Sequence, residues 1–159
     1  MKYGISELSI VPIRIEKNGA SAMCSQLLYG EYFKVVEYKK KRSRIRTIPD
    51  GFEGWVENRQ IRPLSKKEFL ALKKLKRTKL CADLVSFIEG ENHLTTIVLG
   101  SRLNGLRLLK HHFDGEMVKF SVKKKALSTL ALSYLNAPYL YGGKTPFGID
   151  APGLIQMVY

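Results

Sequence analysis

Short segments rich in valine, isoleucine and aromatic residues follow one another closely through the first 62 residues of the chain. Sequences typical of tight turns separate them, such as Lys-Asn-Gly at 17–19 and Pro-Asp-Gly at 49–51. Apolar segments of this length between glycine-containing turns are typical of β-strands. Strands at such close spacing predict a small β-barrel over residues 1–62. The clearest strands are expected at residues 8–16, 32–38, 44–48 and 54–58.

A helix is expected directly after the barrel. Pro63 interrupts the β pattern, and Ser65 with Glu68 three residues later forms a capping box, which marks a helix start. Apolar and basic residues continue the helical pattern over 69–77. Residues 63–80 are therefore predicted to form a basic linker helix.

Segments with a β-like composition return over residues 81–120, at 82–90, 93–100 and 116–122. From Val122 apolar side chains recur at helical spacing until Pro138 ends the run. The apolar positions are Ala126, Leu127, Leu130, Ala131, Tyr134 and Leu135. The chain is thus predicted to be an α+β protein, and its 45% hydrophobic content is enough to bury a core.

The positive charge is concentrated in the first half of the chain. Residues 1–80 contain 19 Lys and Arg against 8 Asp and Glu, so most of the net charge of +13 belongs there. The densest basic runs, 37–47 and 65–79, indicate either a solvated basic face or attraction for nucleic acid, anionic lipid or an acidic polymer. Tyr38 and Phe69 are the aromatic residues inside these runs, which gives little support to nucleic-acid binding.

Cofactor, metal and export signals are weak. Cys24 and Cys81 are too few for a disulfide framework, and the pair His111 and His112 lacks two further ligands at matching spacing. The three histidines are therefore expected to be surface or loop residues, and no cofactor or metal is predicted. The N-terminal residues have no apolar stretch of signal-peptide length, and no later segment is long enough to span a membrane, so a cytoplasmic protein is expected.

The segment 134–159 carries the most specific pattern. It has an aromatic-Gly-Gly turn at 141–143, Thr-Pro-Phe-Gly at 145–148, an apolar residue and Asp150 before a new apolar run. It resembles the nucleophile segment of the NlpC-type cell-wall endopeptidases, which are papain-like cysteine peptidases of bacteria. In addition, residues 27–31 and 50–56 are similar to the bacterial SH3-like domains that precede the peptidase domain in multidomain members of that family.

The resemblance implies a domain order. An SH3-like β-barrel over 1–62 and the basic linker helix over 63–80 would precede a second, diverged SH3-like segment over 81–120. Residues 121–159 would then be an incomplete NlpC-type peptidase domain that holds its N-terminal helical part. The implied parent activity is hydrolysis of the γ-D-glutamyl-diamino acid bond of murein stem peptides, in the recycling of such peptides.

Two departures from the family pattern predict that this chain is inactive. Ala151 stands where the family has its nucleophilic cysteine, and Pro152 stands where it has serine. The chain also ends at Tyr159, before the position of the family's catalytic histidine. Three hypotheses follow: a truncated or altered endopeptidase, a pseudoenzyme that still binds murein peptides or peptidoglycan fragments, or a basic SH3-like module that binds nucleic acid.

Four residues are candidate substrate contacts by resemblance. Asp150 would bind the free amino end of a substrate peptide or serve as a helix N-cap. The ring of Tyr141 would line the binding site or pack in the core. Glu53 would pair with a substrate ammonium group while Phe52 lines the pocket, unless both belong to a simple hairpin turn beside a buried Trp55.

The last helix has a predicted consequence for assembly. It is expected to begin at Pro152, and the apolar residues 154–158 would then present a face without a sheet to cover it. Such a face favours self-association of the chain.

Overall fold

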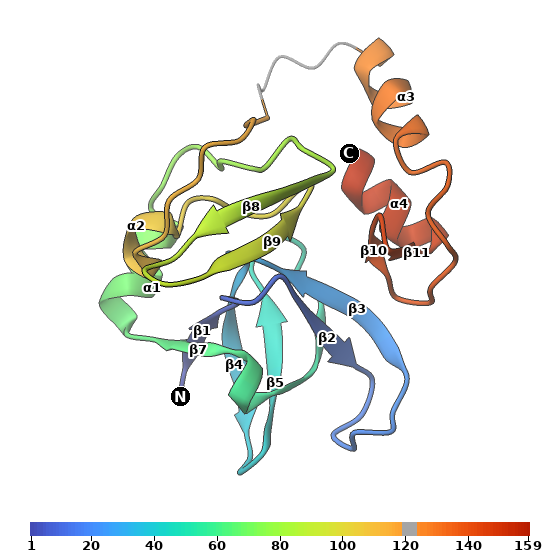
Figure 1. Ribbon diagram of the computed structural model, residues 1–159. Coiled ribbons are helices and arrows are strands. Elements are labelled where there is room, and N and C mark those ends of the chain that lie inside the picture. Colours follow the sequence, from blue (N-terminus) through green and yellow to red (C-terminus); the bar gives the residue numbers. More distant parts are fainter. Residues whose placement is uncertain (119–123) are drawn as a thin grey trace.

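An antiparallel sheet organises the first part of the chain. The computed structural model describes residues 1–118 and 124–159, and the strands of this sheet, all within the first of these ranges, follow the order β3-β2-β6-β5-β4-β1-β7 (Figure 1). They are β1 (Tyr3–Ile5), β2 (Ile10–Arg14), β3 (Met23–Leu28), β4 (Tyr32–Tyr38), β5 (Arg42–Thr47), β6 (Glu53–Glu57) and β7 (Arg62–Leu64). The buried side chains of this sheet form one core cluster: Val11, Ile13, Leu27, Phe33, Ile45, Val56 and Ile61.

The strands that sequence patterns predicted are present, and three more were missed. Strand β4 has the predicted bounds, and buried and exposed side chains alternate along β5 as the two-residue period of a strand requires. The missed strands β1, β3 and β7 contain Gly4, the polar pair Ser25–Gln26 and Pro63, all of which weaken a strand signal. Pro63 was expected to end the β region but lies within β7, an edge strand, where a missing N–H is tolerated.

The helix predicted after the barrel is α1 (Lys66–Lys73), and its capping box is confirmed. The Ser65 hydroxyl accepts a hydrogen bond from the Glu68 N–H at 3.2 Å, and the Glu68 carboxylate accepts one from the Ser65 N–H at 2.7 Å. The helix ends at Lys73, earlier than expected. Repulsion among the closely spaced cations of residues 73–77 explains the early end.

Helix α1 packs into a core that it shares with both neighbouring parts of the chain. The middle part contains the hairpin of β8 (Val85–Glu89) and β9 (Leu94–Val98) and the short helix α2 (Leu106–Leu109). A second core cluster joins these elements to the sheet: Ile5, Tyr29, Tyr32, Leu64, Phe69, Leu72, Cys81, Ile88, Ile97, Leu103 and Leu109. Of the β-like segment predicted at 116–122, Met117 bridges to Cys81 and residues 119–122 lie outside the described part. The domain division at 62/63, 80/81 and 120/121 stays a prediction.

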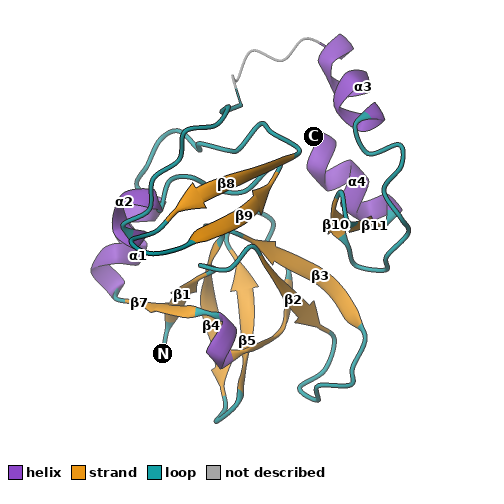
Figure 2. Cartoon of the chain, viewed as in Figure 1, coloured by secondary structure: helices purple, strands orange, loops and turns teal. Residues whose placement is uncertain are grey.

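The C-terminal elements gather beside β3 and β9 (Figure 2). They are α3 (Lys124–Leu132), the two-residue strands β10 (Lys144–Thr145) and β11 (Gly148–Ile149), and α4 (Ala151–Val158). Leu154 and Met157 of α4 pack against a third cluster of Leu99, Tyr134 and Ile149. The expectation of an uncovered helix face is therefore corrected in part, because this contact covers one side of α4 and leaves Ile155 63% exposed.

One of the histidines expected at the surface is buried instead. The side chain of His111 is 4% exposed, and its Nδ1 lies 2.8 Å from the hydroxyl of the buried Tyr29. Burial lowers the pKa of His111, nearby Glu7 raises it, and the charges of His93 and Arg62 lower it further, with a lowered pKa as the net result. His111 is thus held in its neutral form by its place in the fold.

The stability of the protein is expected to fall as the pH drops below about 6.5. The folded state resists protonation of His111 while the unfolded chain accepts the proton, so the contribution of this residue is complete above that pH and is lost below it. Urea unfolding at pH 7.5 and pH 5.5 measures the effect. His111→Gln should lose less stability between the two pH values than the wild type, whereas the exposed-site control His112→Gln should behave like the wild type. Equal losses in all three proteins would contradict the assignment.

Candidate functional site

The Gly142–Gly143 turn lies directly on the backbone of β3. Gly142 has φ of +73°, a conformation that favours glycine. A Cβ atom at this position would lie 2.7 Å from the Cys24 carbonyl carbon and 3.0 Å from the Cys24 Cα, so a larger residue does not fit. The sequence therefore needs glycine here both for the turn and for its contact with the sheet.

Asp150 connects this turn to the start of α4. Its Oδ1 accepts a hydrogen bond from the Gly153 N–H at 2.7 Å, and its Oδ2 accepts one from the Gly142 N–H at 2.7 Å. The N-cap interpretation of Asp150 is confirmed, because its backbone is extended and its side chain caps the helix. A carboxylate oxygen has a second lone pair, so the half-buried Asp150 retains acceptor capacity for a ligand.

Ala151 and Pro152 occupy the first two positions of α4 and are both exposed. Proline is accommodated there because the first N–H groups of a helix have no partner within the helix. The positive end of the helix dipole lies at this point, where a thiolate would be stabilised. The Ala151 methyl group offers no atom that can act as a nucleophile or a base.

The turn that carries Phe52 is fixed beside α4. Asp50 accepts hydrogen bonds from the Thr47 hydroxyl and, at 3.2 Å, from the Phe52 N–H, and its other oxygen accepts from the Gln156 side chain. Burial raises the pKa of Asp50, but these hydrogen bonds and the charge of Lys144 outweigh it, and the net pKa is below the usual range. Gln156 is five residues from Ala151, or about 7.5 Å along the helix axis.

Glu53 has partners of its own within the barrel. Its carboxylate pairs with Arg44 at 2.8 Å and with Arg46, both from β5. The hydrogen bond from Arg46 is the main cause of its lowered pKa. Two guanidinium groups therefore already neutralise the carboxylate that was expected to bind a substrate ammonium group.

The aromatic candidates are exposed beside these contacts. Phe52 is 36% exposed and Tyr141 is 57% exposed, so neither is a core residue. The core-packing alternative for Tyr141 is therefore wrong. Trp55, expected to be buried, is half-buried, because the neighbouring Gly54 and Val56 occupy the buried face of β6 and Trp55 lies on the other face.

Lys144 is a residue at this site that sequence reasoning missed. It is buried, its N–H donates to the Gln26 side chain at 2.8 Å, and its Nζ lies 3.7 Å from the Glu31 Oε1. Glu31 also accepts a hydrogen bond from the Leu28 N–H at 3.0 Å. A lysine between two turn motifs gives no sign of burial, and a long-range contact of this kind leaves no periodic pattern in the sequence.

The two thiols do not replace the missing nucleophile. Burial raises the pKa of Cys24, and burial raises the pKa of Cys81 to about 11, so both favour the unreactive thiol form. Among residues 1–118 and 124–159, no group of three or more His, Cys, Asp or Glu side chains is placed to hold a metal ion. Within the same residues, no helix is both long and apolar enough to cross a membrane.

The N-terminal barrel is similar to known bacterial SH3 domains. Residues 14–61 match the family model of the bacterial dipeptidyl-peptidase SH3 domain. Dipeptidyl-peptidase 6 of Lysinibacillus sphaericus is 38% identical over 53 residues, which are 33% of this chain and 18% of that protein.

The whole chain superposes on two solved structures at low sequence identity. A NlpC/P60 family protein from Bacillus cereus ATCC 10987 matches with a TM-score of 0.74 at 12% identity, over 99% of this chain and 71% of that one. A NlpC/P60 endopeptidase from Photobacterium damselae subsp. piscicida matches with a TM-score of 0.73 at 15% identity, over 98% of this chain and 42% of that one.

The comparisons define the class to which the fold belongs. The N-terminal barrel is SH3-like, as the resemblance implied, and the chain as a whole has the α+β fold of NlpC/P60 family proteins. The matched segment spans less than a fifth of the length of the curated relative, the peptidase from L. sphaericus.

Asp150→Ala should destabilise the fold by about 2 to 3 kcal/mol, because it removes a helix cap and leaves the buried Gly142 N–H without an acceptor. Asp150→Asn keeps one carbonyl acceptor and should lose about half as much. Urea denaturation at neutral pH measures both, with Asp114→Ala as a control at an exposed carboxylate. A loss for Asp150→Ala no larger than that of the control would show that Asp150 does not hold this junction.

Proposed function

We propose that this chain binds cell-wall stem peptides without hydrolysing them. The proposed binding surface consists of the 50–53 turn of the SH3-like barrel, the Gly142–Gly143 turn and the first turn of α4. The observation that carries the proposal is the contact of Asp50 with Gln156, which fixes the Phe52 turn of the barrel beside the helix that Asp150 caps. Support also comes from the SH3 domain match and the NlpC/P60 fold.

The side chains exposed on this surface suit a peptide with a free amino end. Phe52 and Tyr141 present aromatic faces that can contact the aliphatic parts of a stem peptide. Asp150 supplies a carboxylate with remaining acceptor capacity for an ammonium group. Glu53 has a lesser role in the proposal, because Arg44 and Arg46 already occupy its carboxylate.

The absence of hydrolysis follows from the residue at the start of α4. A peptidase of this type needs a thiolate at that position and a histidine as general base. Ala151 supplies no nucleophile, and the buried His111 is bonded to Tyr29 on the side of the molecule that carries α2. The ligand class proposed is therefore the γ-D-glutamyl-diamino acid stem peptide that NlpC-type enzymes cleave, here as a bound ligand.

Isothermal titration calorimetry with a synthetic stem peptide tests the proposal. A stem peptide with a free amino end is expected to bind, and chromatography should find it intact afterwards. Phe52→Ala and Tyr141→Ala should each weaken binding about three- to tenfold. The control Tyr38→Ala removes an equally exposed tyrosine from β4, distant in sequence from α4, and should bind like the wild type.

Two results would overturn this function. The first is the absence of heat with stem peptides at millimolar concentration, where even weak recognition is detectable. The second is equal weakening by the site variants and by Tyr38→Ala. Cleavage of the peptide by the wild-type chain would contradict the non-catalytic part of the proposal alone.

A further inference from the structure

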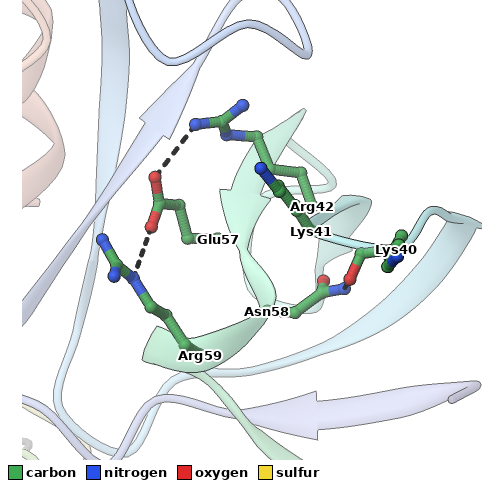
Figure 3. Close-up of a pocket in the computed structure, with 6 residues that line it drawn as sticks. All are labelled: Lys40, Lys41, Arg42, Glu57, Asn58 and Arg59. Atoms are coloured by element: carbon green, nitrogen blue, oxygen red, sulfur yellow. Dashed lines mark hydrogen bonds and ion pairs between the residues drawn. The ribbon is translucent and has the colours of Figure 1, made fainter.

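A basic cavity lies at the end of the barrel where β4 turns into β5. It has a volume of about 590 Å³ and is lined by Lys40, Lys41, Arg42, Glu57, Asn58 and Arg59 (Figure 3). Four of these six side chains are cations and one is a carboxylate, so the wall of the cavity carries a net positive charge. Such a wall attracts an anion.

This cavity is separate from the proposed peptide-binding surface. Arg42 begins β5, and Thr47 ends the strand beside the turn that contacts α4. Five strand residues span about 17 Å, so the two sites lie at opposite ends of β5. Figure 1 shows the β4–β5 hairpin tip pointing away from α4.

Glu57 orients the two arginines of the cavity. Its carboxylate accepts a hydrogen bond from Arg42 Nη2 at 3.0 Å and one from Arg59 Nε at 2.8 Å. These bonds, the one from Arg42 first, hold the pKa of Glu57 below its usual range. Among the described residues, the Lys40 and Lys41 ammonium groups and the Arg59 terminal nitrogens have no ion-pair partner, so their charges face the cavity or solvent.

Asn58 fixes the hairpin that carries the two lysines. Its Nδ2 donates to the Lys39 carbonyl at 2.8 Å, and its N–H donates to the Lys41 carbonyl at 3.0 Å. Its Oδ1 accepts a hydrogen bond from the Ser43 hydroxyl at 2.7 Å, which orients the amide. The cations are therefore presented by an ordered backbone, which reduces the entropy that a ligand must overcome.

Arg42 lines both this cavity and a smaller one. Its Nη1 donates to the Lys17 carbonyl at 2.9 Å, while its Nε is buried and has no hydrogen-bond partner within residues 1–118 and 124–159. The smaller cavity, of about 110 Å³, adds Arg14 and Trp55 to the surroundings of Arg42. A nitrogen that solvent cannot reach is also out of reach of a ligand, so the donors available to an anion are the exposed Lys40, Lys41 and Arg59.

We propose that this basic cavity binds the phosphate groups of a phosphate monoester or of a polyphosphate chain. Lysine ammonium and arginine guanidinium groups are the side chains that bind phosphate oxygens in proteins through charge-assisted hydrogen bonds. The volume exceeds that of one phosphate, which leaves room for the attached organic group. The lining of the larger cavity contains no aromatic residue, so a nucleic-acid base finds no stacking surface there.

The test is a titration of the full-length chain followed by ¹⁵N NMR at constant ionic strength. The probes are inorganic phosphate, glycerol phosphate, polyphosphate of defined length and single-stranded DNA of equal charge. Saturable changes are expected in the chemical shifts of the backbone amides of residues 39–42 and 57–59. Equal affinity per phosphate for glycerol phosphate and polyphosphate would identify a phosphate-group site, and tighter polyphosphate binding would identify a polymer site. The absence of shifts at these amides, or tighter binding of DNA than of polyphosphate, would overturn the proposal.

Matched variants distinguish a specific phosphate-binding site from attraction by the general basic charge of the protein. Lys41→Gln and Arg59→Gln should each weaken phosphate binding at least about tenfold, because each removes a charge-assisted donor. Both side chains are exposed, so the fold should be unchanged. Lys67→Gln removes the same charge from the exposed side of α1 and should change the affinity less than about twofold. Equal weakening by Lys67→Gln would show that phosphate affinity depends only on net charge, and would contradict a specific binding site in the cavity. Stem-peptide binding should be unaffected by these variants, so the two proposals fail independently.

Discussion

The hydrogen bonds of the Asp150 carboxylate determine the geometry of the C-terminal part. One oxygen caps α4 and the other holds the Gly142 N–H, so the helix start and the glycine turn form one unit. Gly153 makes this possible, since a Cβ atom there would lie 2.1 Å from the Gly143 carbonyl oxygen. The position of Ala151 at the start of α4 follows from this junction.

The SH3-like barrel holds that unit in place through polar contacts. The backbone of β3 lies against Gly142, the buried Lys144 is held by Gln26 and Glu31, and Asp50 binds Gln156. Buried polar contacts add less net stability than apolar packing, but they fit only one orientation of the two partners. The barrel therefore acts as the support of the candidate surface and also supplies part of it. A separate role for its opposite end, at the basic cavity, is consistent with this division.

The parts of the fold that could be predicted are those with a local signal. The β4 strand, the capping box of α1 and the glycine turn are encoded by neighbouring residues, and each was recognisable. Strand β3 was missed because its polar residues Ser25 and Gln26 are buried, and the partner of Gln26 is Lys144, more than a hundred positions away. The burial of His111 depends in the same way on Tyr29, which lies 82 residues earlier. The sequence predicted candidate residues of the site but not which side chains they bind, as the pairing of Glu53 with two arginines illustrates.

The central claim is that the barrel positions α4 through polar contacts, and hydrogen exchange tests it most directly. The amides of Leu154 and Tyr159, which are bonded within the helix, are measured in the wild type and in Lys144→Met. Removing one partner of a buried ion pair costs about 3 kcal/mol, so protection in α4 should fall about a hundredfold while the amides of β5 keep theirs. Unchanged, low protection of α4 in both proteins would show that the helix is not held by the barrel and would contradict the account.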